Sequence, residues 1–357
     1  MSTDLPVPET RVLAVASHVV SGYVGNKIAV FTMQSLGCDV AALNTVQFSN
    51  HTGYRQVKGT KVSAQEITDL FDGLKQSYLD DFDMMLSGYI PGAEAVEAVG
   101  KIAAELKVKA QSRGEPGRFF WVLDPVMGDN GKLYVAQDVV PAYKSLLPNA
   151  DLILPNQFEA ELLSDVKITD LSSLTHAIEV IHTTYRVPHI VLTSVSLDTS
   201  SESSSTSKPQ TLSVIGSTMT SSHKPRAFTI RFPAIDAYFS GTGDMFAALM
   251  VVRMREAVVS AGEQGLGDRA AWLSDDSVDA LELPLAKAAE KVLASMHEVL
   301  GATCDSMKAE VKRVETEIGT EDEKRLHLAK SKAAELRLVR HLGSLRDPQV
   351  QFKAQKM

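Results

Sequence analysis

The segment Ser-Gly-Thr-Gly-Asp at residues 240–244 carries the clearest chemistry in the chain, because it opens a helical stretch that continues through Val259. Its two glycines let successive backbone amides converge, and the N-terminus of a helix adds partial positive charge there. Such a turn can cradle a phosphate. Asp244 could then take a proton from a hydroxyl that attacks the phosphate. The same pattern also suits an ordinary turn with a helix cap, and the sequence contains no Walker A loop.

Further carboxylates follow apolar runs that read as strands. Asp124 comes directly after Phe119–Leu123, and Asp129 lies in the same loop. A carboxylate at the end of a parallel strand suits cations that neutralise phosphates. Asn156 and Glu159 follow the next apolar run, but they also have the spacing of a helix N-cap and its N3 partner, which needs no metal. Both interpretations remain open.

Short apolar runs alternate with helical patterns through the first half of the chain, which predicts βαβ units and a parallel sheet with helices on both faces. The expected strands are Arg11–Ser17, Asp39–Asn44, Met84–Ser87, Phe119–Leu123, Asp151–Leu154 and Ile190–Thr193. The expected helices are Asn26–Leu36, Ser63–Leu79, Ala93–Lys107, Asp138–Leu147 and Leu171–Thr184. Ser63 and Glu66 have the spacing of a capping box.

The domain organisation predicted is a flexible N-terminus over residues 1–10 and a single domain over 11–357. A Ser-rich insertion at about 196–222 contains too few apolar residues to pack, and we expect a solvated spacer there rather than a lid. A second, polar insertion is expected at about 260–284. From Met307 onwards the sequence predicts one or two amphipathic helices.

Composition excludes several classes of protein. Apolar residues make up 44% of the 357 residues and charged residues 22%, as in soluble globular proteins. The net charge of −8 argues against general binding to nucleic acid or anionic membranes. Cys38 and Cys304 are far apart and predict free thiols in a reducing compartment. The N-terminal residues lack the apolar core of a signal peptide, and no apolar run is long enough to span a bilayer. We expect a cytoplasmic protein.

A series of stretches, in consistent order, resembles the pyridoxal kinases of the ribokinase-like superfamily. They are RVLAVASHVVSGYVGN, LNTVQFSNHTGY, MLSGY, LDPVMGD, LYV, PNQFEAELLS, VLTS and GTGDMFAALM, and ELRLVRHLGSLRDP resembles the family's C-terminal end. The resemblance implies an α/β fold with a largely parallel central sheet flanked by helices. It also implies ATP-dependent phosphorylation of the 5′-hydroxyl of pyridoxal, pyridoxine and pyridoxamine in vitamin B6 salvage, and a homodimer.

The resemblance assigns roles to individual residues. It makes Asp244 the general base, with the amides of Gly241, Thr242 and Gly243 as an anion hole. The substrate-binding residues it implies, besides Asp244, are Ser17, Val46, Thr52, Tyr89 and Tyr134, the last on a flap. The ATP-binding residues it implies, besides Thr242 and Gly243, are Asp124, Asn156, Thr193, Ser194, Ile235, Asp236 and Ala237.

The same resemblance implies Mg²⁺ near Asp124 and Glu159, and a monovalent cation, K⁺, beside ATP. One position departs from the family's pattern: Leu154 stands before Pro155, where a threonine is common, and leucine offers no hydroxyl to a cation or phosphate. Ordinary structural roles stay open for all these residues. His51 in particular suits a loop hydrogen bond better than a catalytic base.

Three other functions remain open. A kinase acting on the hydroxymethylpyrimidine of thiamine synthesis would use the same glycine turn, although His-Thr-Gly-Tyr at 51–54 and Tyr134 favour pyridoxal. A non-catalytic carrier of the vitamin or of pyridoxal 5′-phosphate could retain the fold, but it would not need Asp244. An interaction protein built on the Ser-rich and C-terminal segments has no motif to support it.

Overall fold

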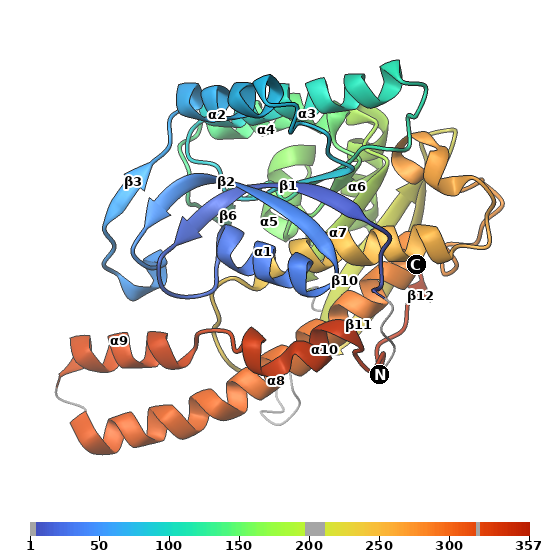
Figure 1. Ribbon diagram of the computed structural model, residues 1–357. Helices are drawn as coiled ribbons and strands as arrows, with labels where there is room; N and C mark the ends of the chain where they lie inside the picture. The colour runs from blue at the N-terminus through green and yellow to red at the C-terminus, as the bar shows by residue number, and fades with distance from the viewer. Residues whose placement is uncertain (1–4, 197–210, 319–321) are drawn as a thin grey trace.

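A ten-stranded sheet lies between two layers of helices in the computed structural model, which describes residues 5–196, 211–318 and 322–357 (Figure 1). The strands follow the order β12-β11-β10-β9-β8-β5-β4-β1-β2-β3. Their bounds are β1 Thr10–Val19, β2 Cys38–Phe48, β3 Gly59–Lys61, β4 Met84–Ser87, β5 Phe120–Leu123, β8 Leu152–Ile153, β9 His189–Val195, β10 Thr211–Met219, β11 Pro225–Pro233 and β12 Gln355–Lys356. A separate hairpin consists of β6 Gly128–Asp129 and β7 Lys132–Leu133.

The middle of this sheet is parallel. Strands β2, β1, β4, β5, β8 and β9 pair with their neighbours in parallel, whereas β3, β10, β11 and β12 add antiparallel strands at the two sides. The carboxyl ends of the parallel strands therefore share one edge, which is where open α/β sheets bind ligands. The predicted fold class is confirmed.

Each face of the sheet buries its own apolar cluster. Along β1, Val12 and Ala14 belong to the cluster on one face, while Leu13 and Val15 belong to the cluster on the other. The first face is covered by α1 Gly25–Ser35, α7 Thr242–Ser260 and α8 Pro284–Ile318. The second is covered by α2 Ala64–Gln76, α3 Ala93–Ser112, α4 Val139–Leu146, α5 Gln157–Ser164 and α6 Leu171–Tyr185. This alternation follows from the period of two in a strand.

The C-terminal part adds a helical hairpin beneath the first face. Helix α8 runs antiparallel to α9 Glu323–Ala333, and α10 Leu342–Arg346 follows (Figure 1). Five short 3₁₀ turns complete the described elements: η1 Thr52–Tyr54, η2 Leu147–Asn149, η3 Leu266–Asp268, η4 Ala270–Trp272 and η5 Leu338–His341. Among the helices of the described residues, none is both long and apolar enough to cross a membrane.

Local sequence signals placed several elements correctly. The predicted strand Met84–Ser87 has those bounds in the structure, and the other expected strands lie within a few residues of the observed ones. Ser63 accepts a hydrogen bond from the Glu66 amide, and Glu66 accepts one from the Ser63 amide, so the predicted capping box is confirmed.

The structure corrects the extent of the first insertion and the polar character of the second. The Ser-rich insertion predicted at 196–222 is too long, because Thr211–Met219 forms β10 within the sheet; residues 197–210 lie outside the described part of the chain. The insertion at 260–284 is not simply polar. Trp272 is fully buried, stacks on Phe120 with ring centroids 4.1 Å apart, and donates a hydrogen bond to the Gly117 carbonyl.

The expected flexible N-terminus also differs where the structure describes it. Val7 is buried in the apolar cluster on the α1 face, and Thr10 already begins β1. Residues 1–4 lie outside the described part of the chain. Apolar burial thus extends the ordered part of the chain upstream of the predicted boundary at residue 11.

Candidate active site

The turn that opens α7 lies at the carboxyl edge of the sheet, and its geometry requires glycine. Gly241 has a φ of +84°, and a β-carbon placed on it would lie 2.2 Å from the Tyr23 carbonyl oxygen. Gly25, which begins α1, has a φ of +54°, and its β-carbon would lie 2.1 Å from the Ser17 carbonyl oxygen. An L side chain fits neither position. The two glycines therefore allow the start of α1, the end of β1 and the start of α7 to meet.

Asp244 points into this meeting place. The backbone amide of Gly25 donates a hydrogen bond to its carboxylate, and a β-carbon on Gly88 would lie 3.8 Å from its Oδ1 atom. Burial raises the pKa of Asp244, and the Gly25 amide opposes that rise. The proposed base thus sits between β1 and β4 in a site that makes it a better proton acceptor than an exposed aspartate.

Two further carboxylates share the edge. Asp124 follows β5 and is only 7% exposed. Burial raises the pKa of Asp124 well above its usual value, and the neighbouring charges of Glu159 and Asp244 raise it further. Burial likewise raises the pKa of Glu159, to about 7. Three acidic groups so close together concentrate negative potential, and a bound cation would relieve it.

The hydrogen bonds of Glu159 limit how it could meet a cation. Its Oε1 atom accepts hydrogen bonds from the amides of Met127 and Gly128 at 2.8 and 3.3 Å, and its Oε2 atom accepts one from the Asn156 amide at 2.9 Å. Asn156 caps α5 and its Nδ2 atom donates to the Gly128 carbonyl. The capping interpretation of this pair is confirmed. Because both oxygens of Glu159 are occupied, contact through water suits this residue better than direct ligation.

Asp124 fits a cation more directly, since it is buried among acidic groups that a positive charge would stabilise. Within the described residues, no group of three His, Cys, Asp or Glu side chains has the arrangement of a metal-binding cluster. A cation here would therefore need ligands beyond the protein, such as phosphate oxygens and water, as Mg²⁺ at nucleotide sites commonly has.

Tyr134, which the resemblance places on a flap, directly follows the hairpin β6–β7. The turn of this hairpin, Asn130-Gly131, has φ values of +50° and +75°, the pattern of a type I′ turn that matches the twist of a hairpin. The Tyr134 amide donates a hydrogen bond to the Met127 carbonyl, and the residue is 62% exposed. Asp129 is exposed in the same hairpin and accepts hydrogen bonds from Asn130. The role of Tyr134 toward the substrate stays a prediction.

The other predicted substrate residues come from three separate segments. Ser17 lies in β1 against Gly25, and Val46 is fully buried in β2. Tyr89 follows β4, is half-buried, and its carbonyl accepts a hydrogen bond from the Thr45 hydroxyl at 2.7 Å. Thr52 is exposed in η1, the 3₁₀ turn of the loop between β2 and β3.

The predicted nucleotide residues lie on the other side of the edge. Thr193 is half-buried in β9, with its amide bonded to the Pro155 carbonyl, and Ser194 beside it is exposed. Ile235 and Ala237 are half-buried in the loop before α7, where the Ala237 amide donates to the Ile235 carbonyl; Asp236 is exposed between them. Leu154 is buried in the α1-side apolar cluster, so this position adds no polar contact to the site.

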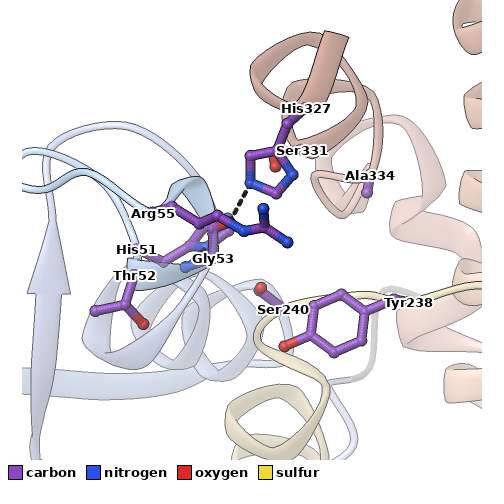
Figure 2. Close-up of a pocket in the computed structure, with 9 residues that line it drawn as sticks. All are labelled: His51, Thr52, Gly53, Arg55, Tyr238, Ser240, His327, Ser331 and Ala334. Carbon is purple, nitrogen blue, oxygen red and sulfur yellow. Dashed lines mark hydrogen bonds between the residues drawn. The ribbon is translucent and has the colours of Figure 1, made fainter. Parts of the chain in front are cut away.

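A cavity of about 310 Å³ lies between η1, the loop before α7 and helix α9 (Figure 2). It is lined by His51, Thr52, Gly53, Arg55, Tyr238, Ser240, His327, Ser331 and Ala334. His327 Nε2 lies 3.0 Å from the Gly53 carbonyl oxygen, the contact drawn as a dashed line. The cavity therefore joins Thr52 to Ser240, the residue before the glycine turn.

His51 has a structural partner, as the sequence suggested. Its Nδ1 atom accepts a hydrogen bond from the Gly53 amide, and its Nε2 atom lies 3.2 Å from Glu335 Oε1. The sequence did not single out Glu335, Gly25 or Tyr23 as site residues. The stretches RVLAVASHVVSGYVGN and ELRLVRHLGSLRDP contain these residues, but they gave them no individual role, because the contacts of Gly25 with β1 and of Glu335 with the site join segments distant in the sequence.

Comparisons with known proteins identify the family of the chain. The family model described as phosphomethylpyrimidine kinase matches residues 29–258. The chain is 33% identical over 358 residues to the pyridoxal kinase of Arabidopsis thaliana, an alignment covering 100% of this chain and 97% of that one. It is 36% identical over 310 residues to the pyridoxal kinase of Ovis aries, covering 84% and 88%.

Solved structures extend the agreement to three dimensions. The pyridoxal kinase of Leishmania donovani in complex with ADP and pyridoxamine superposes with a TM-score of 0.75 at 29% identity, over 98% of this chain and 100% of that one. The same enzyme with ADP and pyridoxine gives a TM-score of 0.74 at 30% identity. With the glycine turn, the buried aspartate and the parallel sheet in place, these matches show that the chain belongs to the pyridoxal kinase family of the ribokinase-like superfamily.

Proposed function

We propose that the chain transfers the γ-phosphoryl group of ATP to the 5′-hydroxyl of pyridoxal, and of pyridoxine and pyridoxamine, in vitamin B6 salvage. The observation that carries this proposal is the position of Asp244. It lies in the first turn of α7, where the carboxyl ends of β1, β4 and β5 converge, and its carboxylate accepts a hydrogen bond from the Gly25 amide. Relatives of the same family carry the name pyridoxal kinase, and one binds ADP together with pyridoxamine.

In the proposed reaction Asp244 accepts the proton of the 5′-hydroxyl as its oxygen attacks the γ-phosphorus, and ADP leaves with the bonding electron pair. The raised pKa of Asp244 makes the carboxylate a stronger base. The amides of Gly241, Thr242 and Gly243 stabilise the charge on the transferred phosphoryl group, assisted by the α7 dipole. Thr52, Tyr89 and Tyr134 orient the vitamin ring, and Thr193 and Asp236 contact ATP.

Asp124 and Glu159 would hold Mg²⁺, Glu159 through water. Bound there, the ion would neutralise phosphate charge. A monovalent cation such as K⁺ would have to bind without a hydroxyl at position 154, because Leu154 is buried in the apolar core. We further propose that residues 11–357, together with the buried residues just upstream of them, form one kinase domain, and that the enzyme is a cytoplasmic homodimer.

A hydroxymethylpyrimidine is the second candidate substrate, because the family model that matches is described by a phosphomethylpyrimidine. It would use the same base and anion hole, so only the residues that contact the substrate ring can distinguish it from pyridoxal. The loop with His51 and Thr52 and the Tyr134 hairpin favour a pyridine vitamin.

The test is a steady-state assay with Mg-ATP and K⁺ in which pyridoxal and the hydroxymethylpyrimidine compete. Asp244→Asn should lower kcat by about 10²–10⁴-fold and leave the Kd for ADP within about twofold, since a general base contributes that much. Asp72→Asn is the matched control, because Asp72 lies in α2, has a side chain that is 46% exposed, and pairs with Lys75. Near-normal turnover by Asp244→Asn refutes the base; exclusive turnover of the pyrimidine refutes the substrate.

A further inference from the structure

Glu335 joins the C-terminal helical hairpin to both halves of the candidate site. It follows α9 closely, and its side chain is 19% exposed. Its Oε2 atom accepts a hydrogen bond from the Tyr23 amide at 3.0 Å, and its Oε1 atom accepts one from the Tyr54 hydroxyl at 2.9 Å. His51 Nε2 lies 3.2 Å from the same Oε1 atom. One carboxylate thus has three partners in two segments near the N-terminus.

The first of these segments supports the glycine turn. The Tyr23 amide donates a hydrogen bond to the Glu335 carboxylate. The Tyr23 carbonyl oxygen lies against Gly241, 2.2 Å from where a β-carbon of residue 241 would stand. The neighbouring Gly22 has a φ of +102°, and a β-carbon there would lie 2.6 Å from Glu335 Oε1. The carboxylate therefore fits closely against backbone that touches the phosphate turn.

The second segment is η1, which carries Thr52. His51 and Tyr54 flank it, with ring centroids 4.7 Å apart, and both contact Glu335. His327 of α9 adds a contact to the Gly53 carbonyl (Figure 2). The residue proposed to contact the vitamin is therefore fixed on both sides by groups that Glu335 and α9 hold.

Hydrogen bonds stabilise the negative charge of Glu335 at this position. Burial raises its pKa, but hydrogen bonds from His51, the Tyr23 amide and the Tyr54 hydroxyl outweigh that effect and hold the pKa below its usual value. Hydrogen bonds to an ionised acceptor are stronger and more directional than neutral ones. Because two of the three partners are side chains of His51, which caps η1, and of Tyr54, which ends it, the loss of charge should act mainly on that turn.

We propose that Glu335 is a positioning residue for phosphoryl transfer: it holds η1, and with it Thr52, in register with the glycine turn at Gly241. This inference rests on the proposed function, since it concerns the binding of pyridoxal. Glu335 touches neither the vitamin nor ATP in this scheme. Its effect reaches the vitamin through η1, whereas its hydrogen bond to the Tyr23 amide fixes the carboxylate against the backbone beside the phosphate turn.

The kinetic test compares Glu335→Gln with the wild-type chain. Glutamine keeps the size of the side chain and one acceptor oxygen but removes the charge. We expect the KM for pyridoxal to rise about tenfold, the loss typical of a charge-assisted hydrogen bond, with kcat falling less. The Kd for ADP should stay within about twofold. Tyr54→Phe should shift the KM for pyridoxal in the same direction but less, and the double variant should show less than the product of the two effects.

Glu315→Gln is the matched control. It removes an exposed ion pair between Glu315 and Lys330, which joins α8 to α9 without touching η1. If it raises the KM for pyridoxal as much as Glu335→Gln does, the effect belongs to the hairpin as a whole and the proposal is overturned. Equal loss of pyridoxal and ADP binding in Glu335→Gln would overturn it as well, because that outcome marks general damage to the fold.

Amide hydrogen exchange separates this proposal from the proposed function, since it needs no turnover. Residues 21–24 and 51–55 should exchange faster in Glu335→Gln than in the wild type or Glu315→Gln. Unchanged exchange in both segments refutes the positioning role, whatever the activity. The wild-type chain could also fail to phosphorylate pyridoxal while Glu335→Gln still exchanges faster than it does. That outcome supports the role of Glu335 in ordering η1 and refutes only the substrate.

Discussion

Two glycines of the same turn should respond very differently to substitution by alanine. Gly241 has a φ of +84° and faces the Tyr23 carbonyl oxygen, 2.2 Å from where a β-carbon would stand. Gly243 lies inside the first turn of α7, and the nearest atom to its β-carbon position is Asp124 Oδ2 at 3.9 Å. The first site has neither the conformation nor the space for a methyl group, whereas the second has both.

The expected magnitudes follow from this difference. The left-handed conformation costs an alanine about 1–2 kcal/mol, and the Gly241→Ala methyl must also displace the Tyr23 backbone. In Gly243→Ala the methyl meets no clash, and the higher helix propensity of alanine offsets part of any loss by up to about 1 kcal/mol. The free energies of unfolding of the two variants should therefore differ by at least about 2 kcal/mol.

Urea unfolding of the ligand-free variants, followed by circular dichroism, measures this difference, and titration with ADP reports whether the turn still binds phosphate. We expect Gly241→Ala to unfold at clearly lower urea and to bind ADP at least tenfold more weakly. Equal urea midpoints for the two variants would refute the explanation that position 241 requires glycine because of its backbone conformation and its contact with Tyr23.

Three further predictions concern stability. Burial lowers the pKa of His189 to about 4 in the folded chain, so the unfolded state binds more protons below about pH 6.5. His189 alone should therefore lower the free energy of unfolding by up to about 1.4 kcal/mol per pH unit as the pH drops from 6.5 to 4. His189→Gln should make this slope shallower in urea titrations at several pH values. Trp272→Ala should lower the free energy of unfolding by about 3–5 kcal/mol, because it removes a buried ring that stacks on Phe120. An unfolding midpoint within experimental error of the wild type would contradict the burial described. Asn156→Ala should lower the free energy of unfolding by about 1–2 kcal/mol, because it removes the cap of α5 and the hydrogen bond to the Gly128 carbonyl. Removing a fully exposed cap would lower it less.

Local patterns predicted those parts of the fold that local physics determines. The strand Met84–Ser87 is a short apolar run in a fully buried position, and the capping boxes at Ser63 and Asn156 depend on residues three positions apart. The turn at Gly241 was identified for the same reason. In each case the residues that form the feature are neighbours in the sequence.

Features set by distant contacts were missed. Strand β10 carries several Ser and Thr residues, and pairing with β9 and β11 is what makes it a strand. Trp272 looked like part of a polar insertion until Phe120, far away in the sequence, supplied its partner. The role of each candidate site residue toward ligand stays a prediction, because the comparisons show the family and not the individual contacts.

The two ends of the sheet bear on how copies of this chain can associate. Strand β3 has three residues, all exposed, and β12 has two, both exposed, and each of them contains a lysine. Short, charged outer strands offer few free backbone groups to a strand from another molecule, and this protects a long sheet against aggregation. A homodimer of this chain should therefore form through helices and loops, leaving both ends of the ten-stranded sheet outside the interface.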